Sequence, residues 1–262
     1  MSETLLIDKT DGVATLTLNR PERLNTIDFE MLEALIAALD DMAADDDVRC
    51  LVLTGSGDTF CAGADIGRGD QSASRGRLEW QDIVERYLHP VRQIAALWKP
   101  VITVCKGNVF GGGLGLAMAS DLRIASDDSR YSAPFIKLAL TGCDMSTGYF
   151  LPRLVGLGRA TEMMMTGRVM KAEEAGQSGL VTEVVPRAEL DQRVADLARG
   201  FADGPPRALA MTKQGIRRSL DRDMAAEFDY ELYSQVQLLQ GDDFQEGVAA
   251  FFEKRPPRFT GL

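Results

Sequence analysis

The chain has 262 residues, of which 45% are hydrophobic and 26% are charged, as expected for a globular protein with a substantial core. Its 39 acidic and 29 basic residues give a net charge of −10, which excludes general binding to the nucleic-acid backbone. No secretory signal and no run of about 20 apolar residues is visible, and the four cysteines show no paired spacing, so we expect a cytoplasmic protein with reduced thiols and no membrane partner.

Strand and helix patterns alternate from the start of the chain. Residues 13–19 (VATLTLN) alternate like a half-buried strand. Residues 27–42 carry apolar side chains at helical spacing, with Asp28 available as the N-cap. Residues 50–54 (CLVLT) then predict a short buried strand.

The same rhythm recurs further along the chain. Residues 77–98 predict a helix that is interrupted at Pro90, and residues 101–105 (VITVC) predict another buried strand. A glycine-rich turn leads into a helix of small residues at 112–120, and a further strand is expected at 122–125. Strand, glycine loop, helix and strand in this order are typical of an α/β fold.

After Leu151 the pattern becomes mostly helical. Pro256 and Pro257 stop an aromatic and basic helix in the tail. We predict an α/β core at residues 1–200 and a helical C-terminal region at residues 201–262. The other helical segments expected here span residues 161–166, 172–178, 191–201 and 207–239.

Two glycine-bearing segments follow buried strands: Phe60-Cys-Ala-Gly-Ala-Asp-Ile66 and Gly107-Asn-Val-Phe-Gly-Gly-Gly-Leu-Gly-Leu116. Both supply backbone N–H groups at the carboxyl ends of strands, where ligands of α/β sheets bind, and glycine lets the backbone approach a ligand closely. Two amides aimed at one oxygen stabilise the negative charge that forms when a thioester is enolised or attacked. Glycine content alone favours a pair of ordinary tight turns with close helix–strand packing, and the oxyanion interpretation stays open as the alternative.

The chain resembles the crotonase (enoyl-CoA hydratase/isomerase) superfamily through segments that cover nearly its whole length in the same order. These segments are RPERLNTID, LVLTGSGDTFCAGADI, KPVITVCKGNVFGGGLGLAMASDLRIAS, YFLPRLVGLGRATEMMMTGR, AEEAGQSGLVTEVVP and EGVAAFFEKRPPRF. The resemblance implies a spiral of ββα repeats and a C-terminal helical region that packs a homotrimer or a dimer of trimers. It also implies acyl-CoA thioester substrates, with coenzyme A as part of the substrate and no separate cofactor. The single histidine and the unclustered cysteines predict no metal site. The amides of Ala64 and Gly112 would form the oxyanion hole.

Both glutamates that hydratases of this superfamily use are replaced. One lies three residues after the oxyanion glycine, at the position of Gly115, and the other follows a proline, where Ala133-Pro134-Phe135 places a phenylalanine. Adding water across a double bond needs a base to activate the water and an acid to protonate carbon. Neither Gly115 nor Phe135 can act as either, so hydration by the two-glutamate route is not expected.

One carboxylate remains in a suggestive place. Asp144, eight residues before Pro152, is similar in placement to the catalytic aspartate of dienoyl-CoA isomerases, of the isomerase of phenylacetate degradation and of 4-chlorobenzoyl-CoA dehalogenase. Local sequence also fits a helix N-cap, because Asp144 precedes Met-Ser-Thr. The leading hypothesis is an isomerase in which Asp144 moves a proton on the enolate. Hydration, hydrolysis or dehalogenation through Asp144, and a non-catalytic acyl-CoA binder, stay open.

Further substrate-binding positions follow from the same resemblance. Arg23 and Lys254 are candidates for the CoA phosphates, and Phe251 with Lys254 would reach the CoA of a neighbouring subunit. Tyr149 is expected either to line the acyl pocket or to pack in the core, and the loop at residues 69–80 supplies further pocket residues. The remaining candidates lie beside the oxyanion amides: Leu24, Ala62, Asp65, Ile66, Gly111 and Phe135.

Overall fold

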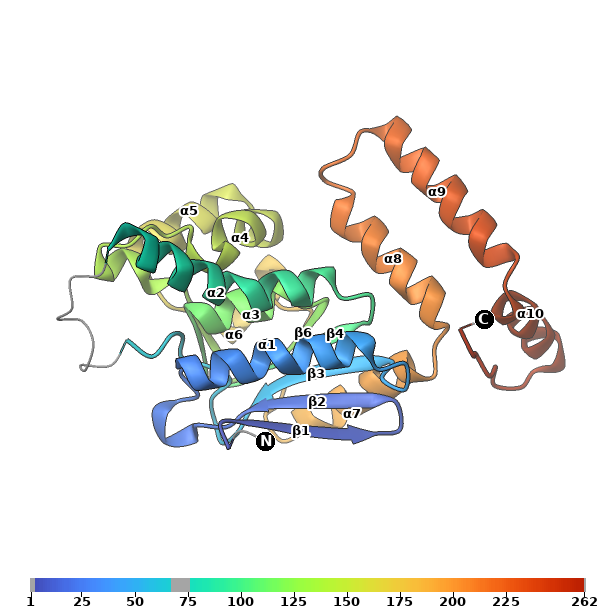
Figure 1. Ribbon diagram of the computed structural model, residues 1–262, viewed down its shortest axis with the longest axis horizontal. Helices are drawn as coiled ribbons and strands as arrows, with labels where there is room; N and C mark the ends of the chain where they lie inside the picture. The colour runs from blue at the N-terminus through green and yellow to red at the C-terminus, as the bar shows by residue number, and fades with distance from the viewer. Residues whose placement is uncertain (1–2, 67–75, 262) are drawn as a thin grey trace.

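The computed structural model describes residues 3–66 and 76–261, which form two β-sheets and a set of surrounding helices (Figure 1). The larger sheet has six strands that are parallel except for the antiparallel pair β1–β2. In sheet order these strands are β1 (Leu5–Thr10), β2 (Val13–Leu18), β3 (Cys50–Gly55), β4 (Val101–Cys105), β6 (Leu122–Ser126) and β9 (Glu183–Val185). The smaller sheet contains β5 (Asn108–Phe110), β7 (Arg130–Ser132) and β8 (Met170–Lys171).

Helices cover both faces of the larger sheet and extend beyond it. Three short 3-10 helices, η1 (Pro21–Arg23), η2 (Pro134–Leu138) and η3 (Asp144–Ser146), lie in the connections. The α-helices are α1 (Phe29–Ala44), α2 (Arg77–Ala96), α3 (Gly112–Ala119), α4 (Thr147–Val155), α5 (Leu157–Thr166), α6 (Ala172–Ser178), α7 (Leu190–Ala202), α8 (Pro206–Arg218), α9 (Met224–Leu239) and α10 (Asp242–Glu253).

The chain winds through the two sheets in turn. After β4 in the larger sheet it enters the smaller sheet as β5 and then forms α3. The next turn repeats this path with β6, β7 and the helices that follow. This arrangement confirms the predicted α/β spiral of ββα repeats, and it brings the ends of β3 and β4 close together.

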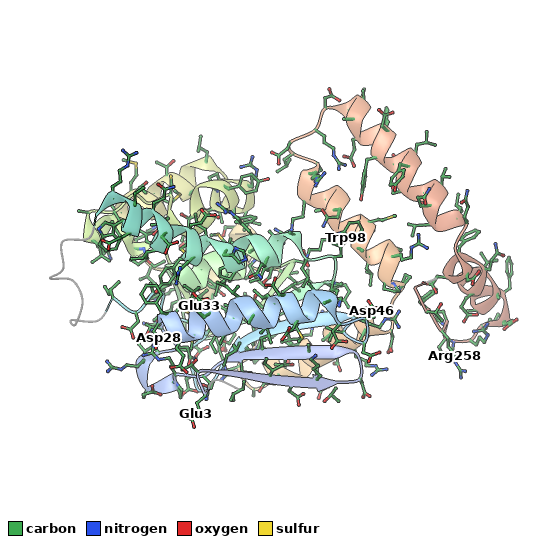
Figure 2. The ribbon with its side chains drawn as sticks, viewed as in Figure 1. Glu3, Asp28, Glu33, Asp46, Trp98 and Arg258 are labelled. Carbon is green, nitrogen blue, oxygen red and sulfur yellow. The ribbon has the colours of Figure 1, made fainter. Side chains whose placement is uncertain are left out.

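The two faces of the larger sheet carry separate apolar clusters because side chains alternate along each strand. Leu51 and Leu53 of β3 face the cluster that includes α1, α2 and α3. Cys50 and Val52 of the same strand face α7. Asp28 caps α1 as predicted, since its carboxylate accepts a hydrogen bond of 2.9 Å from Met31 N–H. Figure 2 shows Asp28 near the start of that helix.

Two predicted helical segments differ from the structure. Pro90 does not interrupt α2, which runs through it with Val91 and Ile94 buried against the core, so packing outweighs the single main-chain hydrogen bond that proline removes. The segment 207–239 is two helices rather than one, and Asp223 starts the second by accepting a hydrogen bond from Ala226 N–H.

The predicted boundary at residue 200 falls inside α7, and the division into two domains stays a prediction.

Helices α8, α9 and α10 form an arm that extends away from the sheets (Figure 1). No residue of α9 is buried. None of the helices described in residues 3–66 and 76–261 is long and apolar enough to cross a bilayer. The large apolar side chains that the arm exposes are Ile216, Leu220, Met224, Phe228, Leu232, Tyr233, Val236, Leu239, Phe244, Val248, Phe251 and Phe252.

Candidate active site

The two glycine-bearing segments lie against each other at the carboxyl ends of β3 and β4. Cys61 holds them in register, because its N–H donates to Asn108 O (3.1 Å) and its carbonyl accepts from Phe110 N–H (3.0 Å). A Cβ atom added at Gly112 would lie 3.7 Å from the Ala64 nitrogen. The two turns therefore converge, and the amides of Ala64 and Gly112 border one small space.

Within the described part of the chain, neither of these two amides donates a hydrogen bond to the fold. Ile27 forms a parallel bridge with Ala64, in which Ile27 N–H donates to Gly63 O and Asp65 N–H donates to Ile27 O, both at 2.8 Å. The N–H of Ala64, the middle residue of such a bridge, points to the opposite side. Gly112 is the first residue of α3, whose first N–H groups lack acceptors within the helix. Across residues 3–66 and 76–261, neither amide has an acceptor, so both are available to one ligand oxygen.

Close packing explains why glycine is needed at this point. Gly111 has φ 51°, a value that side chains other than glycine rarely adopt, and it turns the chain from β5 into α3. At Gly113 a Cβ atom would lie 2.5 Å from the Cys61 carbonyl oxygen, so no side chain fits there. Burial raises the pKa of the Cys61 thiol to about 12, so this cysteine is a neutral packing group beside the site.

Arg20 and Asn25 fix the first of the two segments from the side of the N-terminal strands. Arg20 donates to Thr26 O (2.7 Å) and pairs with the carboxylate of Asp65 (2.9 Å), next to Ala64. Asn25 is fully buried and donates to Ser56 O (2.9 Å) and Thr59 O (2.7 Å). The turn that carries Ala64 is therefore held by side chains of the segment RPERLNTID.

We expect Arg20→Ala to lower the free energy of unfolding by about 2 kcal/mol, because hydrogen bonds to charged groups are each worth about 1.5–3 kcal/mol. Urea unfolding followed by circular dichroism measures the change. Arg23→Ala is the matched control, since Arg23 is exposed on the same segment and its loss should change stability by less than about 0.5 kcal/mol. Equal effects of the two substitutions would contradict the role given to Arg20.

The two positions where hydratases carry glutamate are occupied differently here. A Cβ atom at Gly115 would lie 2.6 Å from the carbonyl oxygen of Met145 and 2.8 Å from its Cβ, so the backbone of the loop at Met145 fills that place. Phe135 is buried, and its ring lies 3.8 Å from the point where a Cβ of Gly111 would stand. Backbone and Cβ of Met145 thus take the place of a side chain at residue 115, and an aromatic ring stands at residue 135.

Asp144 is the residue before Met145, on the loop whose backbone packs against Gly115. It is half-buried at the start of η3, which packs on α2 and α3, and it accepts one hydrogen bond of 2.8 Å from Met145 N–H. It does not cap α4. The N-cap residue of α4 is Ser146, and its side chain makes no capping hydrogen bond. The N-cap interpretation of Asp144 is therefore wrong, and among the described residues its second carboxylate oxygen has no hydrogen-bond partner.

The other sequence-predicted positions fall into two groups. Leu24 and Ala62 belong to the surroundings of the Ala64 turn, since Ala62 N–H donates to Leu24 O (3.0 Å), and Ile66 follows in the same segment with an exposed side chain. Tyr149 contacts a different set of residues: its hydroxyl donates to Asp221 (2.8 Å) and its ring stacks against Arg153. Core packing of Tyr149 is not seen, because its side chain is exposed.

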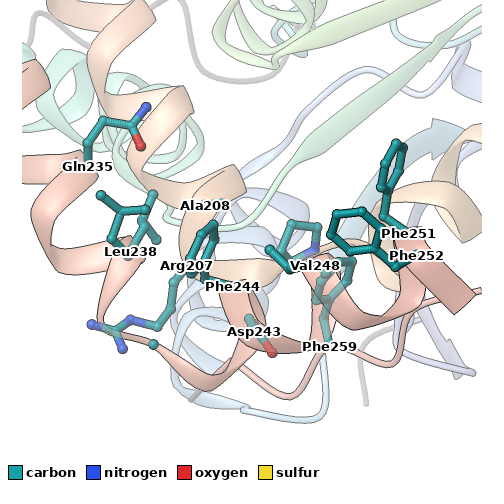
Figure 3. Close-up of a pocket in the computed structure, with 14 residues that line it drawn as sticks. Arg207, Ala208, Gln235, Leu238, Asp243, Phe244, Val248, Phe251, Phe252 and Phe259 are labelled. Atoms are coloured by element: carbon teal, nitrogen blue, oxygen red, sulfur yellow. The ribbon is translucent and has the colours of Figure 1, made fainter.

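The tail positions are far from these loops within one chain. Phe251 and Lys254 lie at the end of α10, across the molecule from the segment that leads to Ile66 (Figure 1). Phe251 is 79% exposed and packs edge-on against Phe252 (Figure 3). Their predicted contact with the CoA of a neighbouring subunit stays a prediction. Of the acyl-pocket residues expected in the stretch 69–80, those at 69–75 lie outside the described residues.

Sequence reasoning missed several residues that shape the site. Tyr87 of α2 donates to Ile27 O (3.0 Å), and burial, followed by the charges of Asp28 and Asp65, raises its pKa to about 12, so it stays a neutral donor. The sequence predicts no role for Met145, because an apolar side chain next to the carboxylate of Asp144 carries no chemical motif. In residues 3–66 and 76–261 no cluster of three or more His, Cys, Asp or Glu side chains could hold a metal ion.

Comparison with known proteins places these features in context. The sequence profile of enoyl-CoA hydratase/isomerase matches residues 8–262. The chain is 37% identical to 1,2-epoxyphenylacetyl-CoA isomerase of Escherichia coli K12 over 262 residues, which is all of both chains. It is 36% identical to a probable enoyl-CoA hydratase of Rhodobacter capsulatus, with 98% of each chain covered.

Solved structures agree with the sequence comparison. A putative enoyl-CoA hydratase from Streptomyces coelicolor A3(2) superposes with a TM-score of 0.94 at 38% identity, covering 99% of this chain and 94% of the other. Enoyl-CoA hydratase from Bacillus anthracis superposes with a TM-score of 0.93 at 31% identity, covering 99% and 100%. The similar proteins are named both as hydratases and as isomerases.

Proposed function

The chain belongs to the enoyl-CoA hydratase/isomerase family, and we propose that within it the protein is an isomerase that moves a double bond in an acyl-CoA thioester. The observation that carries the proposal is a pair of amides, at Ala64 and Gly112, that have no acceptor among residues 3–66 and 76–261. Positions 115 and 135 carry no carboxylate, and Asp144 is the carboxylate on the adjoining loop.

The two amides would hold the thioester oxygen. When a proton leaves the carbon next to the thioester carbonyl, the electron pair of that C–H bond moves onto the carbonyl oxygen and gives an enolate. Amide donors that already point at this oxygen stabilise the charge without reorganising, and one such donor is worth about 3 kcal/mol. The partial positive charge at the first turn of α3 adds to the effect at Gly112.

Asp144 would carry the proton between two carbons. For a 3-enoyl-CoA ester, the ionised carboxylate takes a proton from C2 and becomes a carboxylic acid, while the electrons of the C–H bond spread over a dienolate. The acid then returns the proton to C4, the double bond forms between C2 and C3, and Asp144 is ionised again. The step balances with the substrate and Asp144 alone, so the proposal includes no separate cofactor and no metal.

A panel of CoA esters tests the assignment. The purified protein is incubated with crotonyl-CoA, a 3-enoyl-CoA, a dienoyl-CoA and an aryl-CoA ester, and products are followed by absorbance and mass. We expect products of unchanged mass from the 3-enoyl or dienoyl ester and no hydrated product from crotonyl-CoA. Addition of one water to crotonyl-CoA would instead indicate a hydratase, release of free CoA a hydrolase, and binding without turnover an acyl-CoA binder.

The arm formed by α8, α9 and α10 would pack against other copies of the chain in a homotrimer or a dimer of trimers. Its exposed apolar side chains support this part of the proposal, because apolar surface is stabilised by removal from water. Such packing would bring Phe251 and Lys254 to the CoA held by a neighbouring subunit. Sedimentation velocity measures the number of chains in the particle.

A further inference from the structure

The loop that carries Asp144 has an unusual backbone. Met145 (φ 49°) and Ser146 (φ 60°) are consecutive residues in the left-handed conformation, and neither is glycine. Such conformations persist only where the surroundings impose them. The hydroxyl of fully buried Thr147 lies 2.5 Å from Gly142 O and 2.7 Å from Asp144 O and donates to one of them, which closes the loop on itself.

This backbone path places Met145 at two points of the candidate site. Its carbonyl oxygen and Cβ occupy the place of a side chain at residue 115, at 2.6 Å and 2.8 Å from the position of a Cβ there. Its terminal methyl lies 3.5 Å from the point where a Cβ of Gly112 would stand, and that point is 3.7 Å from the Ala64 nitrogen and from Ile27 Cδ1. Met145 is only 4% exposed, so its side chain is packed beside the residues that carry the two amides and not turned to solvent.

Water addition needs more than an oxyanion hole. The water oxygen bonds to C3 of a 2-enoyl-CoA ester, one water proton goes to a base, and an acid delivers a proton to C2. A position 115 filled by backbone has no room for a second acid or base. The methyl of Met145 and the ring of Phe135 also offer a water molecule no hydrogen-bond partner, and water needs two to four of them to stay in a cavity.

We propose that Met145 determines the reaction specificity of the site, by filling the place of a side chain at residue 115 and by lining the oxyanion space with an apolar group that keeps water from the acyl double bond. The inference rests on the proposed function, because it explains why the enolate is reprotonated and the product is not hydrated. The path of the Asp144 loop, together with the absence of the two glutamates, then favours reprotonation over hydration.

Met145→Ala tests the side chain. The variant and the wild-type protein are incubated with the 3-enoyl-CoA ester that the wild type isomerises, and the ratio of hydrated to isomerised product is measured by mass. We expect this ratio to rise at least about tenfold in Met145→Ala, as Asp144 gains access to a water molecule, which corresponds to about 1.4 kcal/mol in relative barrier height. Met145→Leu, which keeps an apolar group of similar size, is expected to keep the wild-type ratio.

A ratio in Met145→Ala within about twofold of the wild type, in a folded and active protein, would overturn the role of the side chain. Circular dichroism and thermal unfolding establish that each variant is folded. If the wild type isomerises no ester of the panel, the proposed function itself fails, and that outcome is seen before any variant is made.

Gly115→Ala tests the backbone half of the inference without relying on activity. Its added methyl would meet the Met145 carbonyl, so we expect a loss of about 1–3 kcal/mol in stability, as found when a packed core is overfilled. Gly158→Ala is the matched control in α5, because a Cβ there meets nothing within 4 Å. Equal stability of the two variants would show that the loop yields at position 115 and would overturn the steric half of the proposal.

Discussion

Asp144→Asn is expected to lower kcat for double-bond migration by about 10²–10⁴-fold, which is the usual contribution of a positioned acid or base. Asparagine has nearly the same shape as aspartate but cannot take the proton from C2 of the substrate. Its side-chain oxygen can still accept the hydrogen bond from Met145 N–H that the carboxylate accepts at 2.8 Å. Binding of the thioester should therefore change little, so the loss should fall on kcat rather than on KM. Stopped assays with the 3-enoyl-CoA ester measure both constants.

The structure offers a clear control for this variant. Because Asp144 does not cap α4, its replacement should change the free energy of unfolding by less than about 0.5 kcal/mol. A large loss of stability would mean that the kinetic effect reports damage to the loop. A folded Asp144→Asn variant with kcat within about threefold of the wild type would remove Asp144 from the mechanism.

Gly112→Pro should remove one of the two oxyanion donors and lower kcat by about 10²–10³-fold. Proline has no N–H, yet it is well tolerated at the first position of a helix, which is where Gly112 stands in α3. The preceding residue, Gly111, has φ 51° and ψ −116°, an extended mirror conformation in which glycine has no Cβ to collide with the proline ring. The helix should therefore form in the variant.

Gly112→Ala is the matched control because it keeps the N–H and adds a Cβ at the same point as proline. That Cβ would stand 3.5 Å from the Met145 methyl, an ordinary contact, so α3 should be undisturbed. The ratio of kcat between the alanine and proline variants measures the replacement of the N–H by the ring carbon that proline places on the nitrogen. Equal kcat values would exclude the Gly112 amide from stabilising the oxyanion.

The sequence predicted the elements whose signals are local and missed those that depend on packing. Asp28 before an apolar helix could be recognised as a cap, and the strands of the larger sheet could be recognised as apolar runs, because one short segment contains each signal. The break expected at Pro90 is wrong because Val91 and Ile94 hold α2 against the core, and this packing can be seen only in the fold. Asp223 is a typical N-cap residue and starts α9, so the break within the segment 207–239 could have been predicted from the sequence.

The candidate site shows the same limit more sharply. Family resemblance pointed to Ala64, Gly112 and Asp144, and it also revealed the missing glutamates at Gly115 and Phe135. It could not reveal that Met145 fills the place of the residue 115 side chain, because that contact joins residues 30 positions apart along the chain through a left-handed turn that no sequence pattern marks. The pairing of Arg20 with Asp65 is likewise a contact between distant segments.

The arm has a consequence for how the protein is handled. A helix of 16 residues such as α9 is marginal in water on its own, and in a lone chain none of its side chains is buried. Copies of the chain packed against α9, as proposed above, would add to the stability of the folded state by mass action. The melting temperature would then rise with protein concentration, and a single value would have meaning only together with that concentration.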